Sequence, residues 1–246
     1  MNATPHGRHA QRSPTAPPAA PASGDSGAAP PIAAVLFDLD GVLVTTDEFH
    51  YQAWQRLADE EGIPFSREIN HRLRGIGRME SLEILLERSP RAYTDKRKAA
   101  LAHRKNGYYR SSLDTLTPAD VLPGALRILR ELRARGVKTA VGSASRNAPV
   151  ILQRTALAGE VDAIVDGSEV TRSKPDPEVF LLAARKLGVA AERCLVVEDA
   201  PAGIESGRRA SMRVFGIGPR ARHPDVPCIA DGLDAITVDA LLSGPG

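Results

Sequence analysis

The sequence predicts an α/β fold in which a mostly parallel sheet is flanked by helices and a small helical domain follows the first strand. Two observations support this prediction. From residue 118 onward, short apolar runs alternate with amphipathic helical stretches, which is typical of βαβ units in a parallel sheet. By contrast, residues 47–117 show helical periodicity and no strand pattern, so they interrupt the α/β pattern directly after its first strand.

The bulk composition is that of an ordinary globular protein. The chain has 246 residues and a formal net charge of +2, from 32 basic and 30 acidic residues, which argues against an electrostatically driven nucleic-acid binder. No apolar stretch approaches the roughly 18 residues that cross a bilayer. The two cysteines, Cys194 and Cys228, are too few for a disulfide framework. We therefore expect a cytoplasmic protein that binds neither membrane nor nucleic acid.

Residues 1–31 differ in composition from the rest of the chain. They are dominated by Ala, Pro, Gly and Ser and contain almost no large apolar side chain. Such a segment cannot bury enough surface to offset its ordering entropy, so we expect a disordered tail. It also lacks the apolar core of a secretory signal.

The first predicted strand covers residues 33–37, an apolar run that leads directly into Asp38, Asp40 and Gly41. Side chains two apart on a strand point the same way, so both carboxylates project at the carboxyl end, where open α/β sheets bind ligands. Two like charges held close together require a compensating cation, proton or base. Taken alone, the same pattern also fits an ordinary strand-to-turn junction.

The inserted segment divides into several helical stretches. Thr45 and Glu48 fit a capping box before a helix over 47–61, and Gly62 fits its end. A basic, glycine-containing loop follows at 74–78. The other predicted helices cover 66–73 and 96–113, with a further stretch that has Met79, Leu82, Leu85 and Leu86 on one face.

The remaining strands and helices alternate. Asp176 and Pro177 fit the N-cap and first position of a helix that ends at Gly188. The predicted strands are 137–141, 163–165, 194–197, 213–217 and 228–230, and the other predicted helices are 125–135, 149–156 and 202–210.

Polar side chains follow four of the predicted strands. Since parallel strands end together, we expect these side chains at one edge of the sheet: Asp38, Asp40, Ser143, Lys174, Glu198 and Asp199. The carboxylates suit a hard divalent cation, and the serine and lysine suit phosphate oxygens. A carboxylate beside a metal and a lysine is a plausible nucleophile toward phosphorus. Each residue alone also fits an ordinary loop or helix cap.

This set resembles the haloacid dehalogenase superfamily of phosphotransferases. The matching residues are Asp38-Leu39-Asp40-Gly41, Ser143, Lys174-Pro175 and Glu198-Asp199. The resemblance implies a Rossmann-like core over 32–46 and 118–246 and a helical cap domain over 47–117. It also implies that Asp38 is the nucleophile, Asp40 the general acid/base, and Ser143 and Lys174 the partners of the transferring phosphoryl group. The implied Mg²⁺ ligands are Asp38, Glu198, Asp199 and the backbone carbonyl of Asp40.

Five further segments resemble the β-phosphoglucomutase family of that superfamily: 48–54, 73–82, 104–106, 143–147 and 173–175. This resemblance implies that Gly75 and Ile76 bring cap backbone close to a small phosphorylated sugar. It implies that His50 orients the general acid/base or the hinge, and that Trp54, Ser81 and Lys105 contribute to substrate binding. The implied partners of a second, non-reacting phosphate are Arg78, Ser145, Arg146 and Asn147.

The residues leave alternatives open. Trp54 and His50 also fit packed positions on an apolar helix face, and Arg78 fits a solvated charge at a helix start. Thr45 stands where an acid is common in that family, and Arg74 and Arg146 stand where lysine is usual. We expect a monomeric mutase that interconverts β-glucose 1-phosphate and glucose 6-phosphate. The alternatives are a phosphatase acting on a small sugar phosphate or phosphoglycolate-like ester, and a non-catalytic module on the same fold.

Overall fold

The computed structural model describes Met1 and residues 30–219, 221, 223–226 and 228–243. The tail predicted for residues 1–31 therefore lies almost wholly outside the described residues. Within those ranges, none of the helices combines the length and the apolar character needed to span a bilayer. The strands are β1 (Ala34–Phe37), β2 (Lys138–Gly142), β3 (Ala163–Val165), β4 (Cys194–Glu198), β5 (Arg213–Ile217) and β6 (Cys228–Ala230).

The six strands form one parallel sheet in the order β3-β2-β1-β4-β5-β6, which confirms the predicted fold class. β1 lies at the centre, with Val35 opposite Thr139 of β2 on one side and Leu195 of β4 on the other. The chain runs outward from β1 to β3 and then returns to continue on the other side at β4. The strand order thus reverses between β1 and β4, which is where open α/β sheets bind ligands.

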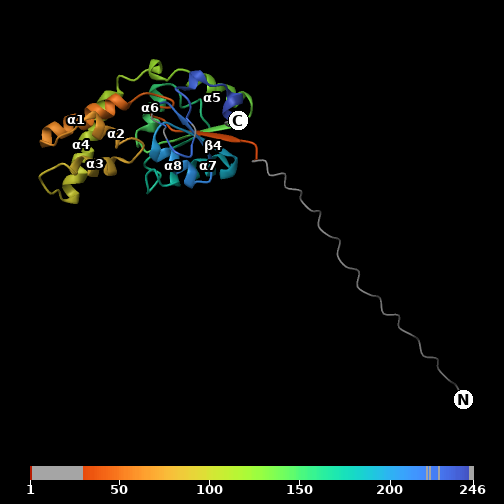
Figure 1. Cartoon of the computed structure of the whole chain (residues 1–246), viewed down its shortest axis with the longest axis horizontal. Helices are drawn as coiled ribbons and strands as arrows, with labels where there is room; N and C mark the ends of the chain where they lie inside the picture. The colour runs from red at the N-terminus through yellow and green to blue at the C-terminus, as the bar shows by residue number, and fades with distance from the viewer. Residues whose placement is uncertain (2–29, 220, 222, 227, 244–246) are drawn as a thin grey trace.

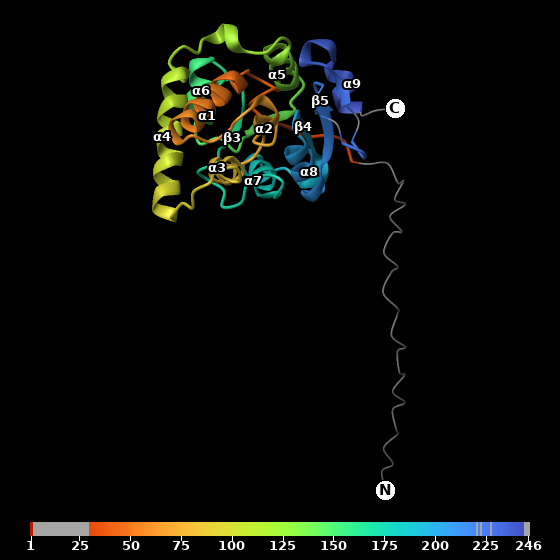
Figure 2. The ribbon, with the colours of Figure 1, turned by 60° about the vertical axis from the view of Figure 1, so that its left-hand side comes forward.

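Helices cover both faces of the sheet, so every side chain of β1 is buried. Val35 and Phe37 belong to a core packed by the helices on one face, and Ala34 and Leu36 to a core packed by those on the other. The first group is α5 (Ala125–Ala134), α6 (Ala148–Arg154) and α9 (Val238–Ser243), and the second is α7 (Glu178–Leu187) and α8 (Pro201–Arg209). α5 and α9 lie on the opposite side of the strands from α7 and α8 (Figure 2).

Four more helices lie together beside the sheet (Figure 1). They are α1 (Asp47–Glu61), α2 (Arg67–His71), α3 (Arg78–Leu86) and α4 (Asp95–Leu113). Three of them, α1, α3 and α4, share an apolar cluster of their own, which includes Trp54, Leu57, Leu82 and Leu101. This arrangement is consistent with the cap predicted for 47–117, although its status as a separate domain stays a prediction.

The chain enters and leaves this group of helices through two adjoining segments. Val44 and Val121 form an antiparallel bridge, and the backbone N–H of Leu122 donates to the carbonyl oxygen of Leu43 at 2.9 Å. We call these two segments, residues 43–46 and 120–122, the neck. Both passages between the sheet and the four helices therefore run side by side.

The predicted start of α1 at Asp47 is confirmed, but its predicted N-cap is wrong by one residue, and so is the predicted start of α7. The N-cap of α1 is Thr46 rather than Thr45, and no capping box forms there, because Glu48 pairs with Arg67 at 3.0 Å instead. α7 begins at Glu178, one residue later than predicted. The backbone N–H of Glu178 donates a hydrogen bond to the Asp176 carboxylate at 3.0 Å. The predicted ends of these helices, Gly62 and Gly188, are confirmed and have φ angles of +68° and +66°.

Candidate active site

The carboxyl ends of β1 and β4 bring two carboxylates against one buried lysine. Lys174 Nζ lies 2.5 Å from Asp38 Oδ1 and 2.7 Å from Glu198 Oε1, and the side chains of Lys174 and Glu198 are fully buried. Burial alone lowers the pKa of the lysine, but the two carboxylates outweigh it and raise that pKa above its ordinary value. The lysine therefore stays charged and holds Asp38 in place.

The negative charge of this cluster exceeds what Lys174 supplies. Burial raises the pKa of Glu198 to about 7 and that of Asp199 to about 9, and neighbouring carboxylates add to both shifts. Ligand atoms of Asp38, Glu198 and Asp199 all lie within 4.8 Å of one another. Buried carboxylates that converge without enough positive charge fit a hard divalent cation, so these three residues can hold a metal ion.

Two glycines allow the carboxylates to sit this close to the backbone. A Cβ on Gly41, whose φ is +87°, would lie 2.3 Å from Asp199 Oδ2. A Cβ on Gly203 of α8 would lie 1.6 Å from Glu198 Oε1, and the other oxygen of that carboxylate accepts from the Ala200 backbone N–H at 2.8 Å. The start of α8 therefore packs directly on the Glu198 carboxylate, one of the three that can hold a metal ion.

Asp40 occupies a different environment, at the boundary with the four helices. Its carboxylate accepts hydrogen bonds from the hydroxyl and the backbone N–H of Thr46. Burial raises the pKa of Asp40 to about 7, the Thr46 hydrogen bonds oppose that rise, and the charge of Asp38 adds to it. His50 Nε2 lies 4.0 Å from Asp40 Oδ2. A buried acid with a pKa near neutrality can both give and take a proton.

His50 also contacts α4 through its other ring nitrogen. Lys105 Nζ lies 2.9 Å from His50 Nδ1 and 4.7 Å from the centre of the Trp54 ring. Burial holds the pKa of His50 well below its usual value, and the charges of Lys105 and Arg78 add to this. Burial lowers the pKa of Lys105 in the same way, with a further contribution from Arg78. Trp54 is only 2% exposed and belongs to the apolar cluster of the four helices.

The loop after β2 folds back on itself at the start of α6. The Ser145 backbone N–H donates to the Ser143 hydroxyl at 3.1 Å, and the Asn147 backbone N–H donates to the Ser145 hydroxyl at 3.2 Å. The Asn147 side-chain amide donates to Asn106 Oδ1 of α4 at 3.0 Å. This last bond joins the α/β core to the helices that cover it.

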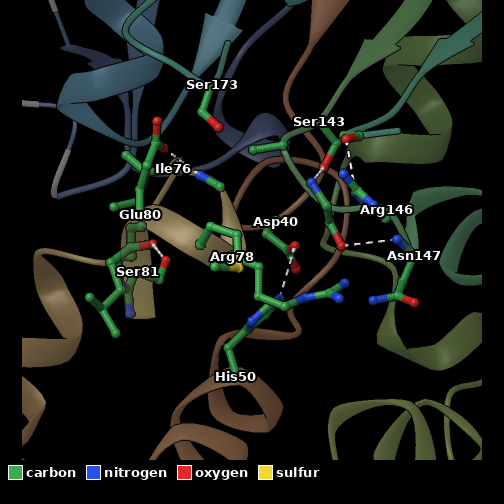
Figure 3. A pocket seen from close by; sticks show the side chains of 18 of the residues that line it. Asp40, His50, Ile76, Arg78, Glu80, Ser81, Ser143, Arg146, Asn147 and Ser173 are labelled. Atoms are coloured by element: carbon green, nitrogen blue, oxygen red, sulfur yellow. Dashed lines mark hydrogen bonds and ion pairs between the residues drawn. The ribbon is translucent and has the colours of Figure 1, made fainter. Parts of the chain in front are cut away.

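Arg78 and Arg146 face each other across the cavity from opposite sides. Arg78 starts α3 and extends toward Arg146 and Asn147 (Figure 3). Burial lowers the pKa of Arg78, and the charge of Arg146 lowers it further, because like charges repel. Arg146 donates from Nε to the Gly167 carbonyl oxygen at 3.2 Å. Two facing guanidinium groups, of which Arg78 is partly desolvated, suit a dianion such as phosphate.

The loop before α3 lies against the α/β core. A Cβ on Gly75, whose φ is +72°, would lie 3.3 Å from Ala200 Cβ, and a Cβ on Gly77 would lie 2.3 Å from Ser173 Oγ. Both glycines therefore permit a close approach of cap backbone to the core. Ser81 is nearly buried, and its hydroxyl donates to the Leu73 carbonyl oxygen at 3.5 Å.

A cavity of about 430 Å³ lies between the core and the four helices. Lys174 and Glu198 do not line it, since they lie beneath Asp38. Every other predicted site residue does: Asp38, Asp40, His50, Trp54, Gly75, Ile76, Arg78, Ser81, Lys105, Ser143, Ser145, Arg146, Asn147 and Asp199. The carboxylates and the two arginines therefore line one cavity.

The sequence analysis missed several polar groups near Asp40. Thr46, Tyr109 and the ion pair between Arg74 and Asp47, with 2.6 Å between Nη1 and Oδ2, were not predicted. Tyr109 lies one helical turn after Lys105, so helical spacing on α4 was an available signal. The Arg74–Asp47 contact carried no such signal, because it joins segments 27 residues apart (74 minus 47).

The fold and this site define a class of enzyme, and a family model agrees with them. The chain belongs to the haloacid dehalogenase-like hydrolase family, whose model matches residues 32–211. The predicted superfamily is therefore confirmed.

Individual relatives refine this assignment. Beta-phosphoglucomutase of Bacillus subtilis (strain 168) is 45% identical over 187 residues, which cover 75% of this chain and 83% of that protein. A crystal structure of beta-phosphoglucomutase from Clostridium difficile superposes with a TM-score of 0.80 at 34% identity, covering 85% of this chain and 94% of the other. A phosphorylated carbohydrates phosphatase from Thermotoga maritima is 30% identical over 188 residues, covering 75% of this chain and 84% of that protein.

Proposed function

We propose that this enzyme is a β-phosphoglucomutase that interconverts β-D-glucose 1-phosphate and glucose 6-phosphate through β-glucose 1,6-bisphosphate. The observation that carries the proposal is a single cavity lined by both carboxylates and two arginines. Asp38 and Asp40 line it together with Arg78 and Arg146. A bisphosphate intermediate needs one phosphate at the reacting carboxylate and a second site for the other phosphate. The similarity to two beta-phosphoglucomutases supports the same function.

We propose Mg²⁺ as the metal, held by Asp38, Glu198, Asp199 and the backbone carbonyl of Asp40. The convergence and the raised pKa values of the buried Glu198 and Asp199 support this choice, because such a site lacks positive charge. Bound there, the ion would offset negative charge on the phosphoryl oxygens during transfer. Lys174 contributes a further fixed positive charge beside Asp38.

Asp38 and Asp40 divide the reaction between them. In the phosphorylated enzyme, the sugar 6-hydroxyl attacks the phosphoryl group on Asp38, the bond from phosphorus to Asp38 breaks to free its carboxylate, and Asp40 accepts the proton of that hydroxyl. The bisphosphate formed then turns around in the cavity. Asp38 attacks the phosphorus at position 1, the bond from phosphorus to sugar oxygen breaks, and Asp40 returns its proton to that oxygen. The aspartyl-phosphate is regenerated and glucose 6-phosphate is released.

The remaining residues hold the two phosphates and the sugar. We propose that Ser143 and Lys174 bind the transferring phosphoryl group, and that Gly75 and Ile76 approach the sugar from the cap. The Arg78 side chain contacts the distal phosphate, together with Ser145, Arg146 and Asn147. The shape and polarity of the cavity depend on four further residues, of which the last two are almost fully buried: His50, Lys105, Trp54 and Ser81. Closure over the core excludes water that would hydrolyse the aspartyl-phosphate.

A direct assay tests the proposal. Purified protein is supplied with Mg²⁺, β-glucose 1-phosphate and a trace of the bisphosphate, and glucose 6-phosphate and free phosphate are followed together. We expect glucose 6-phosphate to form with little free phosphate. Dominant phosphate release from this and related sugar phosphates would instead support the phosphatase alternative, which the Thermotoga maritima relative represents.

We also propose that the enzyme acts as a cytoplasmic monomer on small phosphorylated sugars, without binding nucleic acid or membranes. The nearly balanced charge of the chain, 32 basic against 30 acidic residues, supports the absence of nucleic-acid binding.

A further inference from the structure

Tyr109 lies fully buried near the end of α4 and contacts three groups that surround Asp40. Its hydroxyl oxygen lies 2.9 Å from Thr46 Oγ1. Its ring centre lies 3.9 Å from that of His50 and 4.8 Å from Lys105 Nζ. Tyr109 therefore joins the last of the four helices to the neck, at the residue that hydrogen-bonds the acid/base.

The direction of these hydrogen bonds follows from the number of protons available. The Thr46 hydroxyl has one proton, and it donates this proton to the Asp40 carboxylate. Thr46 Oγ1 can then only accept from the Tyr109 hydroxyl, so the phenol donates. The chain of donors runs from Tyr109 to Thr46 to Asp40. Hydrogen bonds in such a chain polarise and align one another.

We propose that Tyr109 is a positioning residue for proton transfer, because its hydroxyl holds the Thr46 hydroxyl toward Asp40. This inference rests on the acid/base role of Asp40 in the proposed function. Asp40 takes a proton from one sugar oxygen and returns it to another, so its carboxylate must keep one position during both steps. It keeps that position only while the Thr46 hydroxyl stays aligned with it. Without the phenol, Thr46 can rotate about its χ1 angle and release Asp40.

The role of Tyr109 depends on the leaving group. When Asp38 attacks a sugar phosphate, the sugar oxygen leaves only as Asp40 protonates it, because an alkoxide is a poor leaving group. When Asp38 attacks p-nitrophenyl phosphate, the bond from phosphorus to the phenolic oxygen breaks and p-nitrophenolate leaves with the electron pair and needs no proton. A positioning residue for Asp40 therefore affects the first substrate and spares the second.

Tyr109→Phe tests this inference, because it removes the hydroxyl and keeps the ring against His50 and Lys105. We expect kcat for β-glucose 1-phosphate to fall by about tenfold, the size expected for one buried hydrogen bond, with KM unchanged. The first-turnover release of p-nitrophenolate should stay within about twofold of wild type. Tyr108→Phe is the matched control, since the neighbouring phenol bonds the exposed Glu60 and should change neither rate.

A double-mutant cycle with Thr46→Val tests the route through Thr46. If Tyr109 acts through that hydroxyl, Tyr109→Phe should cost nothing further in the Thr46→Val background. Thr46→Ser keeps the hydroxyl and should retain most of the activity. Thermal unfolding of each variant separates loss of folded protein from loss of rate.

Three results would overturn the inference: equal losses on both substrates, a change in KM alone, or additive losses in the double mutant. Failure of the proposed function gives a different result. If the enzyme proves to be a sugar phosphatase, the contrast between sugar phosphate and p-nitrophenyl phosphate still reports on Tyr109, because both cleavages begin with attack by Asp38.

Discussion

Asp38 is the residue on which the proposed chemistry depends. Asp38→Asn keeps the size and hydrogen-bonding capacity of the side chain beside Lys174 but removes the nucleophile. We expect turnover to fall by about a thousandfold or more, while the circular dichroism spectrum and the melting temperature show a folded protein. Asp239→Asn, at an exposed acid paired with Arg135, is the control and should retain full activity. Substantial turnover by Asp38→Asn would remove Asp38 from the role of nucleophile.

Arg78 is the residue that we expect to distinguish a mutase from a phosphatase. Arg78→Ala should lower kcat/KM for β-glucose 1-phosphate by about 10- to 100-fold, because a charged hydrogen bond to the distal phosphate is lost. Hydrolysis of p-nitrophenyl phosphate, which has no second phosphate, should change little. Arg72→Ala removes an exposed cap arginine that pairs with Glu87 and should affect neither reaction. If Arg78→Ala impaired both substrates equally, Arg78 would not be the distal-phosphate partner.

The residues that could be predicted from the sequence are those whose position follows from the backbone. Asp38 and Glu198 end parallel strands, so strand order alone brings them together. Thr46 and Tyr109 could not be placed in this way, because their hydroxyls meet through the packing of α4 on the neck. Side-chain contacts between separate elements depend on helix rotation, which periodicity determines only to within a residue.

At the scale of elements, α8 is coupled to the metal ligands by its third residue. Gly203→Ala would place a Cβ 1.6 Å from Glu198 Oε1, and Glu198 cannot move freely because Lys174 and the Ala200 N–H hold it. We expect a loss of stability of about 1–3 kcal/mol and a higher Mg²⁺ concentration for half-maximal activity. Urea unfolding and a Mg²⁺ titration of activity measure the two effects.

The control for this variant is another helical glycine. Gly107 lies in α4, and a Cβ there would meet nothing within 4 Å. Gly107→Ala should therefore leave the Mg²⁺ requirement unchanged and stabilise the protein by up to about 1 kcal/mol, as expected for this change in a helix. The same shift in Mg²⁺ requirement for both variants would contradict direct contact of α8 with Glu198.

Element types were more predictable than element boundaries. The alternation of apolar runs and amphipathic stretches identified all six strands and the four inserted helices. The N-cap of α1 and the start of α7 were wrong by one residue. Thr46 rather than Thr45 precedes α1, and its hydroxyl bonds Asp40 rather than the helix. Asp176 lies one residue before the Pro177 N-cap. Local propensity does not include such tertiary contacts.

At the scale of the whole molecule, a cation should stabilise the folded protein. Binding to the native state alone adds about 2.7 kcal/mol when Mg²⁺ is present at 100 times its dissociation constant. We expect Mg²⁺ to raise the melting temperature relative to EDTA, with sodium chloride of equal ionic strength as the control. Asp199→Asn should be more stable than wild type in EDTA at neutral pH, since folding no longer has to protonate a carboxyl whose pKa is raised to about 9, and should gain less from Mg²⁺. An equal Mg²⁺ effect on both proteins would contradict the proposed ligand set.

The overall topology was the most predictable feature, because it follows from many residues at once. Right-handed βαβ connections and the central, doubly buried β1 leave few possible strand orders. How the four helices lie over the core could not be derived in this way, since it depends on small contacts such as those of Gly75 with Ala200 and of Gly77 with Ser173.

The neck holds the two ends of the helical insertion next to each other. Val44 and Val121 are bridged, so the chain leaves the α/β unit and returns to it at the same point. The pairing of β1 with β2 therefore depends little on what lies between residues 46 and 120. An insertion with adjacent ends adds little closure entropy whatever its length. Evolution can therefore exchange such an insertion for one of another shape, changing the substrate while the reacting carboxylates stay in place.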